Sequence, residues 1–291
     1  MRITGNRMID VAATATSTNQ SKVAAAAAEA SSGMRVTKPS DDPEAWAAAE
    51  RASVKKTLTA GASSALHAGK ERLEMTDGAL GTIGEALSAM QEMAVQGANA
   101  TYSPSDRKDM AVQIRALMAG AVSAANTKTA DGEYVLAGTQ STTSPFSAAG
   151  VYTGDATSRA LPTSELDVAD SSVTGASLTA SSGVDVLPLF ERMATALENN
   201  DLPALRNLLA DGDTAIKQVG LARTRTGGTI NVLQSALSAH ADLDLHLQSE
   251  IQRAVESDIV TSASNLSKAS QALEASRTVS AFISQIVNPT K

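Results

Sequence analysis

The sequence contains no cysteine and few aromatic residues, and these absences argue against several kinds of protein. Without cysteine, the 291-residue chain has no disulfide framework, thiolate nucleophile, iron–sulfur cluster or cysteine zinc site. Aromatic residues make up only 2% of the chain, so alanine carries much of its 43% apolar content, and a wide aromatic core is not expected. Because alanine has the highest helix propensity and allows close helix packing, this composition favours long, thin helical packing.

The sequence also lacks an excess of basic residues and any long apolar run. It has 24 Lys and Arg residues against 31 Asp and Glu residues, whereas a protein that binds nucleic acid by neutralising phosphates needs the opposite balance or a strongly basic patch. No window of about 18 apolar residues occurs, and the basic N-terminus is not followed by the apolar core of a signal peptide. We therefore expect no nucleic-acid partner, no membrane insertion and no cleaved signal peptide.

Two long helices are predicted in the N-terminal half. The first is an alanine-rich segment that reaches to about residue 32 and is marginal in isolation, because it carries few large apolar side chains. An irregular strip at residues 38–43 follows, where Asp42 is expected to cap the next helix and Pro43 to occupy its first position. This second helix extends to about Asn99 and carries apolar residues at heptad spacing, as coiled coils do. The heptad residues are Leu66, Leu73, Leu80, Leu87, Ile83 and Met90.

Further helices are predicted after this one. Ser103 is expected to cap a helix that folds back antiparallel on its predecessor, and Asp201 to cap another near the C-terminal half. From Asp201 to about Gln285 no residue forces the helix to end, although paired glycines at 227–228 interrupt its apolar periodicity. An uninterrupted helix of roughly 80 residues would be on the order of 120 Å long, so we expect an elongated rod.

Composition changes between residues 131 and 186. Turn signals at residues 131–132 and 154–155 flank short segments that have the character of strands, including residues 134–136. A disordered loop is the competing interpretation, but four of the six Tyr and Phe residues lie in or beside this segment, which favours a small core. The fold class that follows is mainly α: long antiparallel helices with coiled-coil packing, paired terminal helices and a small inserted β-rich domain.

Several segments resemble the flagellin family. At the N-terminus these are residues 1–4, 31–36 and 38–43, of which Pro39–Pro43 is the most specific. Residues 125–126, 131–140 and 145–146 resemble the family's entry into its projecting domain, and residues 256–275 resemble its C-terminal region. Within the family the match is best to the junction proteins between hook and filament. The tail at residues 283–291 departs from the leucine-rich ending expected there.

The resemblance implies a structural subunit of the bacterial flagellum that is exported without a cleaved signal peptide and acts outside the cell. Implied partners are further copies in a ring, another hook-associated protein on the hook side, flagellin on the filament side and a cytoplasmic export chaperone. It also implies three parts: an inner-tube domain (1–43 and 255–291), a helical bundle (44–130 and 187–254) and an outer β-rich domain (131–186). No cofactor is implied.

Candidate contact residues between subunits come from the capped strip, a small basic spot and the C-terminal apolar stripe. For the charged residues of the strip, local helix capping is an equally supported interpretation. The candidates are Arg35, Lys38, Asp41, Asp42, Glu44, Arg223, Arg225, Leu266 and Leu273.

Two other functions compete with this one. The first is a filament flagellin, which would grow long filaments. The second is a helical-bundle metal hydrolase, suggested by His240 with Asp244 and Asp242 with His246 at i, i+4 spacing. These two pairs lie on different helix faces, and the sequence shows no phosphate-binding or nucleophile motif, so we expect neither catalytic nor metal-binding residues.

Overall fold

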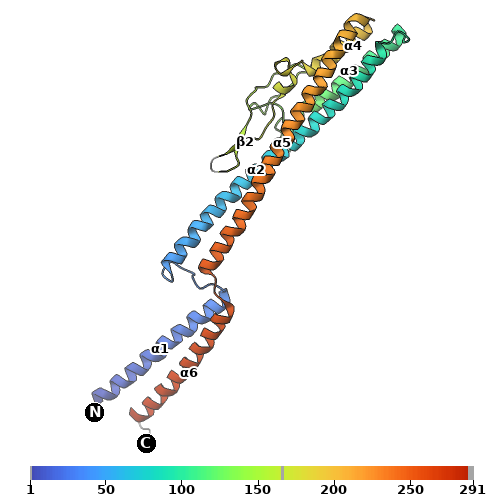
Figure 1. Ribbon diagram of the computed structural model, residues 1–291. Coiled ribbons are helices and arrows are strands. Elements are labelled where there is room, and N and C mark those ends of the chain that lie inside the picture. The colour runs from blue at the N-terminus through green and yellow to red at the C-terminus, as the bar shows by residue number, and fades with distance from the viewer. Residues whose placement is uncertain (1, 165–166, 288–291) are drawn as a thin grey trace. The chain divides into compact units, whose positions relative to one another are not determined.

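The structure, a computed structural model, describes residues 2–164 and 167–287 and is mainly α-helical, as predicted. It forms two compact units, one made of Met1–Leu58 with Leu243–Lys291 and the other of Thr59–Asp242 (Figure 1). We call these the terminal unit and the central unit. The boundaries between these two units fall inside long helices and differ from the predicted domain boundaries. The division into three domains and the overall rod shape therefore stay predictions. None of the helices in the described ranges is long and apolar enough to cross a bilayer.

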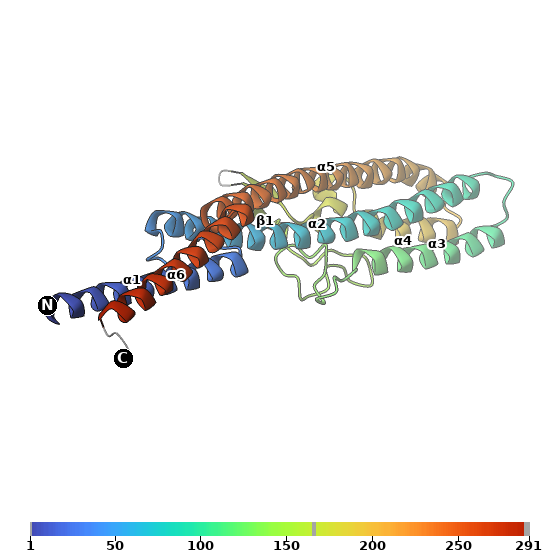
Figure 2. The same ribbon diagram turned by 90° about the horizontal axis from the view of Figure 1, so that it is seen from below.

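In the terminal unit, the first and last helices of the chain lie side by side (Figures 1 and 2), which confirms the predicted pairing of the chain ends. They are α1 (Arg2–Ser32) and α6 (Ile259–Val287). Small polar side chains connect them: the hydroxyls of Thr16 and Ser280 are 3.0 Å apart, and the Asn19 amide donates to the Ala272 carbonyl at 3.2 Å. Residues 288–291, which end the unusual tail, lie outside the described residues.

The terminal unit also holds the start of α2 (Pro43–Gly97) and the end of α5 (Leu202–Val255). The predicted cap is confirmed, because α2 begins at Pro43 and the Ala45 amide donates to Asp42 Oδ1 at 3.1 Å. Lys56 of α2 lies near α5, where its Nζ is 3.7 Å from Asp244 Oδ2.

The central unit packs α2 and α5 with two shorter helices, α3 (Pro104–Ala125) and α4 (Val186–Glu198) (Figure 2). Each predicted heptad residue of α2 is completely buried, which confirms the coiled-coil pattern. Ser103 starts α3 with a capping box, and Asp201 accepts from the Ala204 amide at the start of α5, both as predicted. The apolar core includes Leu80, Leu87, Ile114 and Phe190.

A buried arginine connects the two turns at one end of these helices. The Arg107 side chain, only 4% exposed, donates from Nε to the Gly97 carbonyl at 2.7 Å and from Nη2 to the Asn99 carbonyl at 2.9 Å. Its Nη1 donates to the side-chain oxygen of Asn200 in the α4–α5 turn. No carboxylate among the described residues forms an ion pair with it, so this buried charge is satisfied by neutral acceptors.

The middle segment is not the β-rich domain that the sequence predicted. Among its described residues, the strands are β1 (Ala160–Pro162) and β2 (Val168–Asp170), an antiparallel pair, and the rest is turns, isolated bridges and two short 3-10 helices. The predicted strand at 134–136 is wrong, because only Tyr134 forms a bridge. Val135, Leu136 and Phe146 belong to the same apolar core as the helices, so turns can replace strands where the helices supply the packing partner.

A charged cluster fastens this segment to α2. Glu133 pairs with Arg72 of α2 and with Arg159, whose Nη1 is 3.0 Å from Glu133 Oε2. The Ser141 hydroxyl donates to Glu133 Oε1 at 3.0 Å. Hydrogen bonding from Arg159 and then Arg72 lowers the pKa of Glu133 to about 2, although burial opposes this shift. The carboxylate is therefore ionised in the folded protein at neutral and mildly acidic pH.

The predicted uninterrupted C-terminal helix is wrong, because the chain breaks between α5 and α6. α5 ends at Val255 and α6 begins at Ile259. Asp258 caps the new helix, since its Oδ1 accepts from the Val260 amide at 3.2 Å and its Oδ2 from the Thr261 hydroxyl at 2.7 Å. The signal for this break was an aspartate directly before two apolar residues.

Candidate assembly surface

The pair of α1 and α6, which we call the terminal pair, buries few side chains. Of residues 7–32 and 259–286, only Ala12, Ser262 and Leu273 are buried. Leu266 lies seven residues before Leu273 on the same helix face and is half-buried. The terminal pair thus uses small and polar residues where the central unit uses large apolar ones.

Large apolar side chains of the terminal pair are instead exposed. On α6, Val279, Phe282 and Ile286 recur at i, i+3 and i+7, so they share one face, and Phe282 is 64% exposed. This face is roughly 150° around the helix from Leu273, which is buried in the pair. A contiguous exposed apolar surface of this kind is typical of protein contact sites. Among the residues whose burial is described, the large exposed apolar residues of the pair are Met8, Val11, Ile259, Val260, Val279, Phe282 and Ile286.

None of the contact residues predicted from the sequence belongs to this exposed stripe. The spacing of Val279, Phe282 and Ile286 could have revealed an apolar face near the C-terminus. The sequence does not give the position of α1, however, so it does not tell which face of α6 packs against α1 and which face stays exposed.

Two chain segments between the helices hold each other through their backbones. The Arg35 amide donates to the Val255 carbonyl at 2.8 Å, and the Ser257 amide donates to the Gly33 carbonyl at 2.9 Å. Met34 and Glu256 form an antiparallel bridge between these bonds. Gly33 has a φ of +69°, in the left-handed region that glycine adopts without strain. We call residues 33–36 with 255–257 the backbone clasp.

The candidate residues of the capped strip gather beside this clasp. Arg35 Nη1 is 2.9 Å from Asp42 Oδ2, and its Nη2 donates to the Ala254 carbonyl at 3.0 Å. Lys38 lies 3.9 Å from Asp41, and Glu44 is exposed in the first turn of α2. The structure therefore brings Arg35, Lys38, Asp41 and Asp42 together in local contacts, and their role between subunits stays a prediction.

Both aspartates of the strip are stabilised in their charged form. Hydrogen bonding from the Thr37 backbone amide is the main cause that lowers the pKa of Asp41, with further bonds from the Thr37 hydroxyl and the Lys38 amide. The Ala45 amide, followed by Arg35, lowers the pKa of Asp42. These shifts follow from helix capping and turn geometry.

The remaining candidates divide into paired and unpaired side chains. Arg223 of α5 binds Asp77 of α2 with two 3.0 Å hydrogen bonds, and this pairing raises the pKa of Arg223. Arg225 is exposed and forms no ion pair with any described residue. Arg225 is thus free to contact another molecule, whereas Arg223 is engaged within its own chain.

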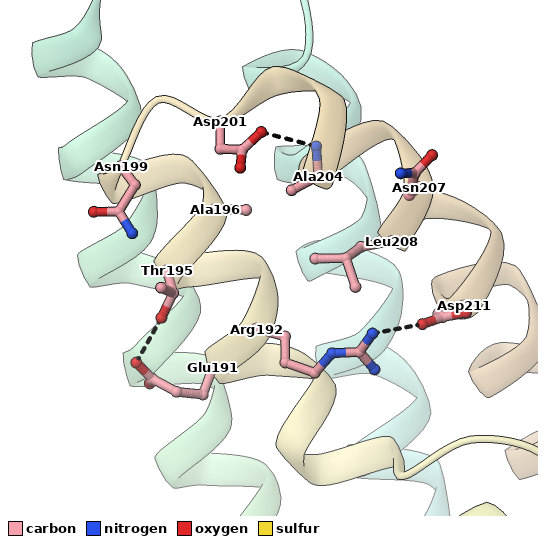
Figure 3. Close-up of a pocket in the computed structure, with 10 residues that line it drawn as sticks. All are labelled: Glu191, Arg192, Thr195, Ala196, Asn199, Asp201, Ala204, Asn207, Leu208 and Asp211. Carbon is pink, nitrogen blue, oxygen red and sulfur yellow. Dashed lines mark hydrogen bonds and ion pairs between the residues drawn. The ribbon is translucent and has the colours of Figure 1, made fainter.

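An open pocket lies between α4 and the start of α5 (Figure 3). Its charged side chains are already paired: Arg192 is 3.0 Å from Asp211, and Glu191 accepts from Arg115 of α3 and from Thr195. In the part of the chain that the structure describes, no three His, Asp or Glu side chains cluster as metal ligands would. His240, one of the residues that suggested a metal site, lies 3.4 Å from the Ser63 hydroxyl.

Comparison with known proteins identifies related sequences and folds. The family model of the bacterial flagellin N-terminal helical region matches residues 3–141. Flagellar hook-associated protein 3 of Escherichia coli K12 is 28% identical over 227 residues, covering 75% of this chain and 71% of that protein. The Salmonella typhimurium LT2 protein of the same name is 26% identical and covers 85% of this chain and 80% of its own length.

Solved structures share the fold. A putative flagellar hook-associated protein from Vibrio parahaemolyticus superposes with a TM-score of 0.68 at 22% identity, covering 74% of this chain and all of that one. FlgL of Bacillus cereus gives a TM-score of 0.58 at 20% identity, covering 69% of this chain and 96% of that one.

Proposed function

We propose that this chain, which is similar to flagellar hook-associated protein 3, joins the hook to the flagellin filament as a structural subunit. Copies assemble in a ring or helix through their terminal helices. One axial neighbour is another hook-associated protein, the other is flagellin, and an export chaperone keeps the chain available before assembly. The site of action is the extracellular part of the flagellum. The chain is not an enzyme, since its curated relatives are hook-associated proteins, a non-enzymatic family.

The observation that carries this proposal is the exposed apolar surface of the terminal pair. Val279, Phe282 and Ile286 expose more than half of their side-chain surface, and Met8 and Val11 do the same on α1. Burying apolar surface against a neighbour contributes about 25 cal/mol per Å². A head-to-tail contact of this kind, repeated around an axis, generates rings or helical arrays.

The test replaces part of this surface in the full chain. The double substitution Phe282→Ser with Ile286→Ser should prevent assembly at high protein concentration and addition to hook ends, measured by sedimentation and electron microscopy. A matched double substitution of exposed apolar residues in the central unit, Val151→Ser with Val168→Ser, should leave assembly unchanged. Equal assembly of both variants would overturn the proposal.

A filament flagellin is the alternative within the same structural class, and the length of the assembled product separates the two. A junction protein adds a limited layer to hook ends, whereas a flagellin extends short seeds into long filaments. Growth of long filaments from the purified chain alone would favour the alternative.

A further inference from the structure

The central unit carries an open, mainly apolar groove between α2 and α3. Small side chains line it, namely Ala86, Ala89, Ala116, Gly120 and Ala121, with Leu117 beside them. Gly120 is exposed, and a Cβ added there would meet no other atom within 4 Å. Glycine inside a helix is less favourable than alanine, and no contact within the described residues explains its presence here. The groove has room for a protruding side chain of another helix.

Acidic residues border this groove. Glu85 and Glu92 flank Ala89 on the exposed side of α2, and no Lys or Arg occurs in α2 after Arg72. On α3, Asp109 shares the groove-facing side with Ala116 and Gly120, at i, i+7 and i+11. Lys108 lies about 100° around α3 from Asp109, and Arg115 is occupied by Glu191 and Glu198 of α4. Besides Asp77, Glu85 lies close enough to Arg223 of α5 for its charge to raise the pKa of that arginine. Glu92 and Asp109 form no ion pair with any described residue, so the groove still presents negative charge beside an apolar floor.

The exposed side of α5 has the opposite character. Lys217, Leu221 and Arg225 recur at i, i+4 and i+8, all three exposed, and Leu221 exposes 51% of its surface. We call these three residues the basic ridge. Gly228 continues the ridge one turn further, and a Cβ added there would meet nothing. No Asp or Glu occurs between residues 214 and 241. No described acidic side chain forms an ion pair with Lys217 or Arg225.

The basic ridge cannot reach the groove of its own chain. Leu221 is two residues from Arg223, which places it about 160° around α5 from the side chain that binds Asp77 of α2. The ridge therefore points away from α2. A second copy of this chain carries both surfaces, so the ridge of one copy can meet the complementary groove of another.

We propose that the basic ridge of one copy docks in the α2–α3 groove of a second copy of this chain. Leu221 enters between the small side chains of the groove, while Lys217 and Arg225 approach Glu85 and Glu92. Because ridge and groove are different surfaces, the contact is heterologous and continues from copy to copy. It is separate from the contact made by the terminal pair. Opposite charges steer this encounter and fix its register, so high salt weakens it.

Cross-linking tests the proposal directly, because the chain has no cysteine of its own. The full chain with Leu221→Cys and Ala116→Cys, treated with a short bismaleimide at high protein concentration, should give a ladder of covalent multimers. A one-to-one mixture of the two single variants should give covalent dimers, and each single variant alone should stay monomeric. Absence of a ladder overturns the proposal. Efficient cross-linking of Leu221→Cys alone also overturns it, because ridge would then meet ridge.

Charge exchange adds a second test. Lys217→Glu with Arg225→Glu, and separately Glu85→Lys with Glu92→Lys, should each reduce self-association at least tenfold by sedimentation, with circular dichroism confirming the fold. Mixing the two variants should restore association, since each mismatched ridge then faces a complementary groove. Failure of the mixture to recover overturns the proposal. The Phe282→Ser, Ile286→Ser variant should retain the 221–116 cross-link, so failure of this contact is distinguishable from failure of the terminal pair.

Discussion

The central unit and the terminal pair are both helical, yet they use apolar residues in opposite ways. In the central unit, Leu66, Leu73, Leu80, Leu87 and Phe190 are completely buried. In the terminal pair, alanine, serine and threonine form the contact between helices, and the largest apolar side chains face outward. The first region stabilises itself, whereas the second keeps its apolar surface available for a neighbour.

This difference shows why helix content alone says little about stability. Both regions form long helices, but a helix in a protein gains most of its stability from packing an apolar face against other elements. Alanine and serine supply helix propensity with little buried area, so the terminal pair is the less stable region of a single copy. Under the proposed function, contact with further copies would bury this surface and so stabilise the chain ends.

The largest expected effect comes from removing a buried ring of the central unit. Phe190→Ala should lower the free energy of unfolding by about 3–5 kcal/mol, because it leaves a cavity in a closely packed core. Phe282→Ala, which removes the same ring from an exposed site, should change it by at most about 0.5 kcal/mol in the monomer. Urea unfolding at low protein concentration measures both.

The assembled state should reverse this order. Phe282→Ala should weaken self-association more than Phe190→Ala does, when both are measured at a temperature and urea concentration at which Phe190→Ala is still folded. A large loss of monomer stability from Phe282→Ala would show that the ring packs within one copy, and the comparison between the two regions would fail.

A smaller effect is expected for the buried arginine. Arg107→Met keeps much of the side-chain volume but leaves the Gly97 and Asn99 carbonyls without their donor. The free energy of unfolding should therefore fall by about 1–3 kcal/mol. Arg206→Met, an exposed arginine on α5, is the matched control and should be nearly neutral. Equal effects of the two substitutions in urea unfolding would contradict the role given to Arg107.

The smallest effect concerns the pH dependence of the central unit. The folded-state pKa of Glu133 is about 2, below its ordinary value of 4.5, so its charge contributes stability above about pH 4.5. This contribution is lost as the pH falls from about 4.5 towards 2. Glu133→Gln should therefore lose less stability than the parent chain between pH 5 and pH 2.5, measured by urea midpoints. Parallel pH profiles of the two proteins would contradict this.

Much of the helical framework could be predicted, because local signals determine it. The heptad of α2 and the caps at Asp42, Ser103 and Asp201 follow from spacing and hydrogen-bonding chemistry within a few residues. The same signal existed at Asp258, but the continuous apolar stripe on both sides of it outweighed a single capping residue in the sequence reasoning.

Features that depend on distant partners could not be predicted. Glu133 meets Arg72 and Arg159 across long stretches of sequence, and a charged residue such as Arg107 gives no sign that neutral carbonyls will bury it. Turn signals around short strand-like segments predict a β-rich middle segment, yet the helix core accepts the apolar residues of this segment in turn conformations. The candidate contact residues had the same limit, since exposure on a helix face depends on which helix lies beside it.

The backbone clasp has a mechanical consequence. Its hydrogen bonds run between main-chain atoms at Gly33, Arg35, Val255 and Ser257, so both chain crossings between the helices are tied to each other. A pull on either chain segment is therefore resisted by the other segment as well, through hydrogen bonds of the main chain. Because main-chain groups form these bonds, most of the nearby side chains can be replaced without removing them.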